Sequence, residues 1–409
     1  MEAAITRAVE TNLQSKLAQA SSKESRGRVL QAAASLLPQL TASVSQTRVF
    51  KENLATLGLN PSPLIPNLVI GPFDTFDARL GLVLKLLDVN AIMETKEASA
   101  NDRAARLQVD LAAEQVAAAA ALAYIEDQRA ISGVADARSN WQLAQRLLTL
   151  TQDQRKAGLA TAVDLARAET REAVDRQDLI EAELSAYRSD LVLKRVIGAA
   201  LTDEFVLCDA STQTPAPVDE DAALAQAAAD RFEVRLTREQ LQAETYGLRA
   251  AQAGFLPTVS ASGDYGFSGN TPDSTARTGS IGAALSLPVF SGGATWGQIQ
   301  AAQGRRFAAQ SRYADTLIQV EEDVRLALHT VSAERDDVDA AETRRRSAQR
   351  ELQLAQDRYR AGAGDNIQVV TAQASLADAL QASADARARY GAARVNLAVA
   401  LGQGRSFRL

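Results

Sequence analysis

The chain has 409 residues, and 44 Lys and Arg residues against 50 Asp and Glu residues give it a formal net charge of −6. This balance provides no basic surface for nucleic acid, which we exclude as a partner. Aromatic residues make up only 5% of the chain while Ala is abundant, and this composition favours long, closely packed helices over two compact cores.

Catalytic and metal-binding motifs are missing from the sequence. Cys208 is the only cysteine and His329 the only histidine, so they provide neither an internal disulfide nor a metal-ligand set. No Walker A or Gly-x-Ser-x-Gly motif is present. The carboxylates follow helical patterns beside Arg, as in stabilising i,i+4 pairs. We therefore expect no enzymatic activity, no cofactor and no metal.

No stretch approaches the 18 apolar residues of a transmembrane helix, and no signal peptide follows Met1. Two explanations are open. The protein stays inside the cell, or the sequence is a mature form to which Met1 was added. The strand patterns described next favour the second explanation.

The first half of the chain predicts a helix, two strands and a long helical hairpin. An amphipathic helix over residues 1–35 precedes alternating strands at about 38–50 and 73–87, and the second alternation is long enough for a tilted strand that crosses a bilayer. Helices then run from about 89 to 156 and from about 161 to 197, with the tip near Gly158. In the second of them, apolar residues follow the 4-3-4 spacing of a coiled-coil seam: Ile180, Leu184, Tyr187 and Leu191.

The second half repeats this order after a polar connection at 201–222. Strands are expected at about 256–268 and 279–290, followed by a helix from about 295 to 360, a tip near Gly362 and a last helix to about residue 401. The segment LSLPVFSGGATWGQIQAAQ changes from a period of 2 to a period of 3.6 and predicts a strand-to-helix junction. Four residues mark this junction: Pro288, Phe290, Gly292 and Gly293. A weaker copy lies at residues 82–99.

Fixed offsets between the halves predict an internal duplication. Pro38 and Pro257 are 219 positions apart, and the pairs Gly158 with Gly362 and Gly198 with Gly402 are each 204 apart. We therefore divide the chain into a first repeat at 1–200, a connecting equatorial region at 201–222 and a second repeat at 223–409.

Four strands per chain are too few to close a transmembrane barrel, and an open sheet edge in lipid is costly, so several chains are expected to share one barrel. Its polar strand faces would be solvated by a water-filled lumen. Aromatic residues near the strand ends fit interfacial belts: Phe50, Phe73, Phe290 and Trp296. The long helices are expected to form a tube of antiparallel coiled coils.

These features resemble the TolC-like outer-membrane efflux proteins, also called outer-membrane factors. The resemblance covers nearly the whole chain. It is strongest in LSLPVFSGGATWGQIQAAQ, in the tip segments RKAGLATAVDLARAE and YRAGAGDNIQVVTAQASLADA, and in the duplicated order of elements. It implies a mainly α protein with β structure, in which a long antiparallel coiled-coil α-barrel continues a trimer-shared transmembrane β-barrel with four strands per chain.

The resemblance also implies location and partners. A homotrimer would sit in the outer membrane of a Gram-negative bacterium, in contact with the lipid bilayer, and extend into the periplasm. It would dock to a periplasmic adaptor (membrane fusion) protein and an inner-membrane pump of the RND or ABC type, and export drugs, metals or proteins.

Tip residues match the family's gate in part. In the family, an acid of the first hairpin engages a tyrosine and an arginine of the second. Asp164 and Tyr359 occupy two of these positions, whereas Gly364 occupies the arginine position and predicts a weakened lock. The alternative for Asp164 is a first-turn acid that the helix dipole favours.

The sequence also matches the family's acidic pore ring only in part. Gln368 and Thr371 stand where some members carry two acids, and Asp365 lies one turn earlier. Three copies of Asp365 would form a displaced ring that binds cations. The alternative is that Asp365 caps the helix that starts at Asn366.

Two functions remain open on these grounds. The first is a passive exit duct of a tripartite efflux or type I secretion system, and the second is a soluble periplasmic coiled-coil scaffold or adaptor. The strand patterns favour the duct, and the missing signal peptide favours the scaffold.

Overall fold

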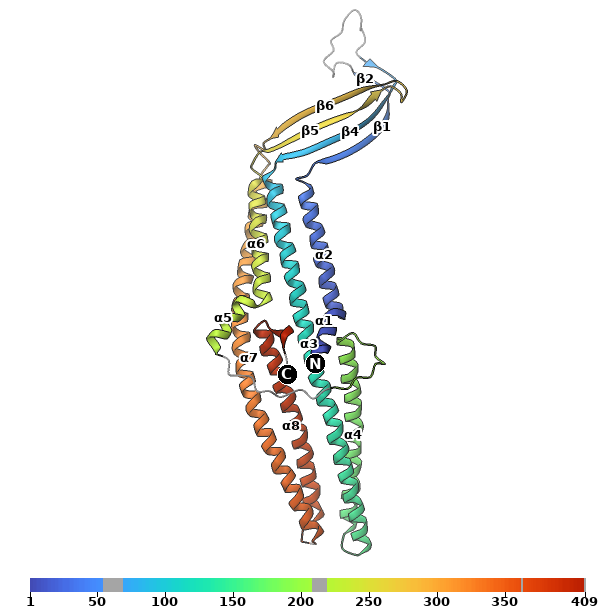
Figure 1. The fold of residues 1–409 in the computed structure, drawn as a ribbon, viewed down its shortest axis with the longest axis vertical. Helices are drawn as coiled ribbons and strands as arrows, with labels where there is room; N and C mark the ends of the chain where they lie inside the picture. The colour runs from blue at the N-terminus through green and yellow to red at the C-terminus, as the bar shows by residue number, and fades with distance from the viewer. Residues whose placement is uncertain (54–68, 208–218, 362, 408–409) are drawn as a thin grey trace, which may run out of the picture. The chain divides into compact units, whose positions relative to one another are not determined.

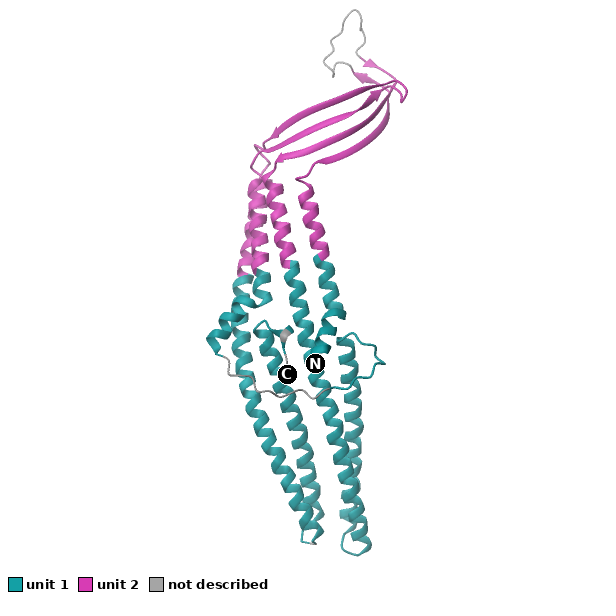
Figure 2. Cartoon of the chain, viewed as in Figure 1, with its two compact units in different colours: residues 1–22, 105–237, 312–409 teal, residues 23–104, 238–311 magenta. Residues whose placement is uncertain are grey.

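The structure is a computed structural model that describes residues 1–53, 69–207, 219–361 and 363–407. Cys208 and Gly362 lie outside the described residues. The chain forms two compact units, of which unit 1 comprises residues 1–22, 105–237 and 312–409, and unit 2 comprises residues 23–104 and 238–311 (Figure 2). Each unit takes segments from both halves of the chain, so this division is distinct from the predicted repeats.

Unit 2 contains a four-stranded antiparallel sheet in the order β1-β4-β5-β6 (Figure 1). Its strands are β1 (Gln39–Val49), β4 (Phe73–Leu87), β5 (Thr258–Gly269) and β6 (Thr275–Ser286). A short pair, β2 (Glu52–Asn53) and β3 (Val69–Ile70), was not predicted. β6 ends at Ser286, before the expected residue 290, because Pro288 has no N–H to donate to a ladder. Among the described strands, β1 and β6 are the edges.

The two faces of this sheet differ in chemistry, as the alternation predicts. One face carries hydroxyl, charged and Gly residues, and the other carries mainly apolar side chains, including Leu80, Leu82 and Leu84. On the polar face, Arg79 donates to Asp77 and, over 2.8 Å, to Asp264, which also accepts a hydrogen bond from Ser280. The network links β4, β5 and β6.

Opposite Arg79 in the register lies Gly266. A Cβ there would lie 2.3 Å from the Ala78 carbonyl oxygen and 2.5 Å from the Arg79 Cβ. Glycine is therefore required for strand β5 to pass beside the Arg79 side chain.

The predicted helix over residues 1–35 is wrong in one respect, because the structure has two helices there. α1 (Glu2–Thr11) and α2 (Leu13–Ala34) are separated by Asn12, which is extended, with φ −62° and ψ 142°. The Asn12 side chain donates to the Val196 carbonyl over 3.2 Å and accepts from the Gln14 N–H over 2.9 Å, so it stabilises the break and the start of α2.

A matching break occurs 219 positions later. Arg231, with φ −60° and ψ 131°, separates α5 (Glu220–Asp230) from α6 (Phe232–Ala253). Its guanidinium is buried and bonds to Glu233 and, over 2.7 Å, to Asp323. The spacing equals that of Pro38 and Pro257.

Four long helices make up most of the remaining described residues: α3 (Val89–Lys156), α4 (Ala162–Val196), α7 (Ala294–Arg360) and α8 (Asn366–Ala400). A short 3-10 helix, η2 (Gly404–Ser406), follows α8. α8 carries a strict seven-residue repeat of buried alanines: Ala372, Ala379, Ala386, Ala393 and Ala400. A seven-residue repeat is typical of a left-handed coiled coil, and small side chains allow close approach. None of the helices in the described residues carries an apolar run long enough to cross a bilayer.

The coiled-coil seam predicted on α4 lies on the wrong face for packing within one chain. Ile180, Leu184 and Tyr187 are 59%, 46% and 62% exposed. α4 instead packs through a neighbouring face that includes Leu179 and Leu193, which are buried. Both faces carry spaced apolar residues, so the sequence alone did not identify the one that α3 and α8 cover.

Candidate functional site

The first hairpin tip is a tight turn built on Gly158. Its φ of +74° lies in the left-handed region, while an added Cβ would meet open space, so the backbone conformation is what favours glycine. The Gly158 N–H donates to Arg155 and the Leu159 N–H to Gln154, which closes the C-terminus of α3.

Asp164 belongs to a reciprocal capping box at the start of α4. The Asp164 N–H donates to the Thr161 hydroxyl over 3.1 Å, and the Asp164 carboxylate accepts from the Thr161 N–H over 3.0 Å and from its hydroxyl over 2.6 Å. These hydrogen bonds from Thr161 lower the pKa of Asp164. Within one chain, these hydrogen bonds match the alternative prediction, in which Asp164 is an acid in the first turn of the helix.

Tyr359 lies in a buried polar cluster that joins three helices of unit 1. It is 7% exposed, and its hydroxyl lies 3.5 Å from the Thr151 hydroxyl of α3. The amide of Asn366 in α8 donates to Thr151 over 3.0 Å and to Tyr359 over 3.4 Å. Leu147, Leu352 and Val369 pack around the cluster.

The structure does not bring Asp164 and Tyr359 together within one chain, because their hydrogen-bond partners are Thr161 on one side and Thr151 and Asn366 on the other. The predicted lock between Asp164 and Tyr359 therefore stays a prediction. Asn366 was not among the predicted gate residues. In the sequence, Asn366 is a polar residue on an otherwise apolar helix face. This feature indicates a functional role only once α8 is known to pack on α3.

Gly364 lies close to the end of α7, since a Cβ there would approach the Cβ of Arg358 to 3.2 Å. Arg358 itself donates to the Ala363 carbonyl over 3.3 Å and so helps to close the second tip. Asp365 is exposed at the N-cap of α8, but its side chain makes no capping hydrogen bond.

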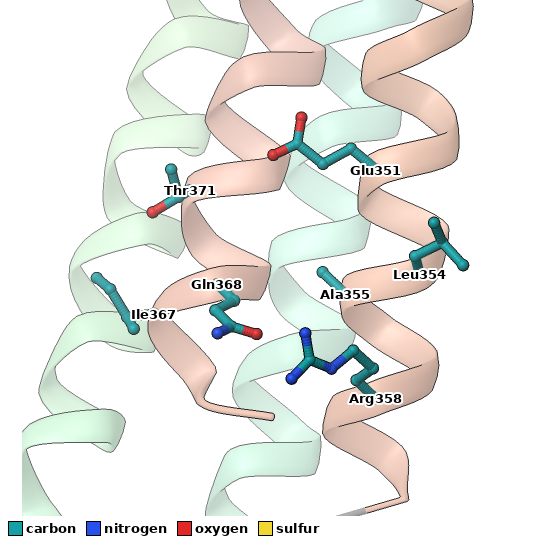
Figure 3. Close-up of a pocket in the computed structure, with 7 residues that line it drawn as sticks. All are labelled: Glu351, Leu354, Ala355, Arg358, Ile367, Gln368 and Thr371. Carbon is teal, nitrogen blue, oxygen red and sulfur yellow. The ribbon is translucent and has the colours of Figure 1, made fainter. Parts of the chain in front are cut away.

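Gln368 and Thr371 line a hollow of about 400 Å³ between α7 and α8 (Figure 3). α7 contributes Glu351, Leu354, Ala355 and Arg358 to it, and α8 adds Ile367. Its lining therefore combines one acid, one base, two uncharged polar side chains and three apolar side chains.

The predicted strand-to-helix junction joins β6 to α7 within unit 2. Gly292 and Gly293 have φ of +60° and +87°, and the Thr295 N–H donates to the Ser291 hydroxyl over 3.4 Å at the start of α7. Pro288 lies in the connection, where Phe290 is 88% exposed. Beyond it, Trp296 meets the Phe255 ring edge-on, with centroids 6.5 Å apart.

Farther from the tip, an ionic cluster joins α7 to α8. Glu342 accepts from Arg345, from Arg387 over 3.0 Å and from Ser383 over 3.3 Å. The hydrogen bond from Arg345 is the main reason that the pKa of Glu342 falls to about 2. On α3, burial raises the pKa of Asp136, and the charges of Arg345 and Arg387 oppose this rise.

Comparison with solved structures defines the class of fold. The outer membrane protein VceC of Vibrio cholerae matches with a TM-score of 0.84 at 21% identity, over 98% of this chain and 95% of that chain. The Campylobacter jejuni CmeC outer membrane channel matches with a TM-score of 0.86 at 20% identity, over 98% and 85%. The fold is that of α-barrel outer-membrane channels, with a largely helical chain and a small sheet.

Sequence comparison adds a family match over the second half of the chain. Residues 223–403 match the family described as outer membrane efflux protein. Outer membrane protein OprJ of Pseudomonas aeruginosa is 27% identical over 66% of this chain and 59% of its own length, and TolC of Escherichia coli is 23% identical over 69% and 60%. The aligned region thus spans about three fifths of these relatives. The predicted resemblance to outer membrane efflux proteins is confirmed, since the second half of the chain matches that family's model and the whole fold matches its channels.

Proposed function

We propose that this protein is the passive outer-membrane exit duct of a tripartite efflux or type I secretion system, and that three copies share one transmembrane β-barrel. The observation that carries the proposal is the sheet of unit 2, which has one apolar face, one polar face and two edge strands without a partner in the described chain. Exposed edges in lipid are costly, so such a sheet needs neighbouring copies to close it.

The exposed side chains support this arrangement. On the apolar face, Val44, Ile281 and Leu285 are 73%, 96% and 72% exposed, as expected of side chains that face lipid. The polar face, with Arg79 and its carboxylate partners, would line the water-filled lumen.

Apolar stripes on the helices of unit 1 support contact between copies. Ile180, Leu184 and Tyr187 on α4, and Ile318 and Leu326 on α7, are exposed in one chain. We propose that neighbouring copies cover these stripes and so complete the helical tube.

The tip residues would form the periplasmic entrance. Around a threefold axis, Asp164 and Tyr359 would hold the entrance shut, and the exposed, uncapped Asp365 would supply a ring of three carboxylates. Energy would come from a pump of the RND or ABC type through a periplasmic adaptor, since the sequence carries no nucleotide-binding motif.

We further propose that the two halves arose by duplication. The helix breaks at Asn12 and Arg231 keep the 219-residue offset, and the positive-φ glycines Gly198 and Gly402 keep the 204-residue offset at the ends of α4 and α8. The alternative of a soluble periplasmic scaffold gains no support from the comparisons, because the matched relatives are outer membrane proteins.

Planar-bilayer recording of the purified protein tests the proposed function. A duct predicts long-lived conductance steps that larger polymers in the bath reduce according to their size. Protein that inserts into the bilayer without conducting ions would contradict the proposal.

A further inference from the structure

The buried face of α8 contains an amide without hydrogen bonds. Gln373 is 4% exposed, and neither its Nε2 nor its Oε1 has a hydrogen-bond partner among the residues that the structure describes. One heptad before it, Asn366 is 2% exposed, and its Oδ1 is likewise unpartnered, although its Nδ2 donates to Thr151 and Tyr359. Polar atoms buried without partners weaken the packing that buries them.

The two hairpins differ in how their second helices begin. Thr161 and Asp164 close a complete capping box at the start of α4. The residues 204 positions later are Asp365 and Gln368, which have the side chains for the same motif, yet Asp365 makes no capping bond. The start of α8 is instead held by a backbone hydrogen bond from the Gln368 N–H to the Asp365 carbonyl and by the two hydrogen bonds that the Asn366 side chain donates.

Small side chains recur along the buried face of α8, whereas larger ones, Leu147, Leu352 and Val369, pack around Asn366. Because the repeated buried residues of α8 are alanines, few large side chains interlock this helix with its neighbours. Gln373 lies one residue beyond the first of these alanines, Ala372. A buried amide at this place makes release of the helix less costly than an apolar side chain of the same length would.

We propose that Gln373 weakens the packing of the first turns of α8, so that these turns can separate from the helices around them. The unpartnered amide raises the free energy of the packed state relative to an open state in which water hydrates it. The start of α8 is then less firmly packed than it would be with an apolar side chain at position 373. The consequence for transport rests on the proposed function, whereas the difference in packing does not.

Hydrogen exchange of the detergent-solubilised, full-length protein tests the proposal. Gln373→Met keeps the length of the side chain and removes the amide, so it should slow exchange of the backbone amides in residues 366–380 by about five- to hundred-fold. Gln381→Met, an exposed change on the same helix, is the matched control and should leave exchange unchanged. Gln373→Asn keeps a buried amide and should exchange at least as fast as the native protein.

Faster or unchanged exchange in Gln373→Met would overturn the proposal, because Gln373 would then stabilise the packing or have no effect on it. Slower exchange in Gln373→Asn would overturn it as well. Bilayer recording gives a second readout, in which Gln373→Met should open less often than the native protein. A protein that never conducts would contradict the proposed function, while the exchange result would still decide the role of Gln373.

Discussion

At the scale of single residues, the tip shows how little of a site follows from residue type alone. The family resemblance pointed to Asp164 and Tyr359, and both make specific hydrogen bonds, but with Thr161 in one case and with Thr151 and Asn366 in the other. Partners on distant helices cannot be read from spacing within one helix. A capping box can be recognised from spacing, because its two members are three residues apart.

The Tyr359 hydroxyl can be removed while its buried ring is kept. Tyr359→Phe should destabilise the protein by about 1 kcal/mol, because the Asn366 amide loses one acceptor and the Thr151 hydroxyl loses a neighbour. Single-channel conductance should rise as the tip loosens, and Asp164→Ala should raise it too. Tyr265→Phe, at an exposed position of β5, is the control for the unfolding measurement. Conductance unchanged in both tip variants would remove Asp164 and Tyr359 from the gate.

Asp365 gives a separate prediction about cations. Its carboxylate is exposed and makes no capping bond, so it is available to a ring of three copies. Asp365→Asn should reduce block of the channel by multivalent cations added on the side of the tip, as measured by titration in bilayers. Equal block in native and variant channels would reject the ring.

Glu342 predicts how the link between α7 and α8 depends on pH. Its pKa of about 2 in the folded protein lies below its ordinary value of 4.5, so its ion pairs stabilise the fold above pH 4.5 and lose this effect as the pH falls towards 2. Thermal unfolding should show that Glu342→Gln lowers Tm at pH 7 and that the difference from the native protein shrinks through this window. A Tm difference between Glu342→Gln and the native protein that stays constant over this pH range would contradict the assignment.

At the scale of elements, periodicity predicted most of the architecture. The change from period 2 to period 3.6 located the junction before α7, and the long unbroken runs predicted α3 and α7 closely. The break at Asn12 was missed because it depends on the Val196 carbonyl of another helix. Within one chain, α4 packs through a different stripe from the predicted one, because two apolar stripes run along that helix and only tertiary contacts choose between them.

Close helix packing through alanine predicts a strong dependence on side-chain size. Ala341 of α7 is buried and its neighbour Ala340 is exposed. Ala341→Leu should lower the stability of the helical bundle by about 1–3 kcal/mol through overpacking, whereas Ala340→Leu should change it by less than about 0.5 kcal/mol. Chemical denaturation measures both, and equal effects would contradict the assignment of α7's buried face.

At the scale of the whole molecule, a single chain leaves edges and apolar surfaces exposed that other copies would cover. The sheet has two unpaired edges among its described strands, and α4 and α7 expose apolar stripes. The sequence predicted a shared barrel by counting strands, since four are too few for closure. The number of copies comes from the family resemblance and not from any residue of this chain.

The central claim is that three chains close one duct, and the mass of the protein extracted in mild detergent tests it most directly. Light scattering coupled to gel filtration, corrected for bound detergent, should give three chains per particle. Leu184→Glu on the exposed stripe of α4 should lower the trimer fraction, and the adjacent Ser185→Glu, also exposed, is its matched control. A monomer or dimer that stays in solution without detergent would contradict the account.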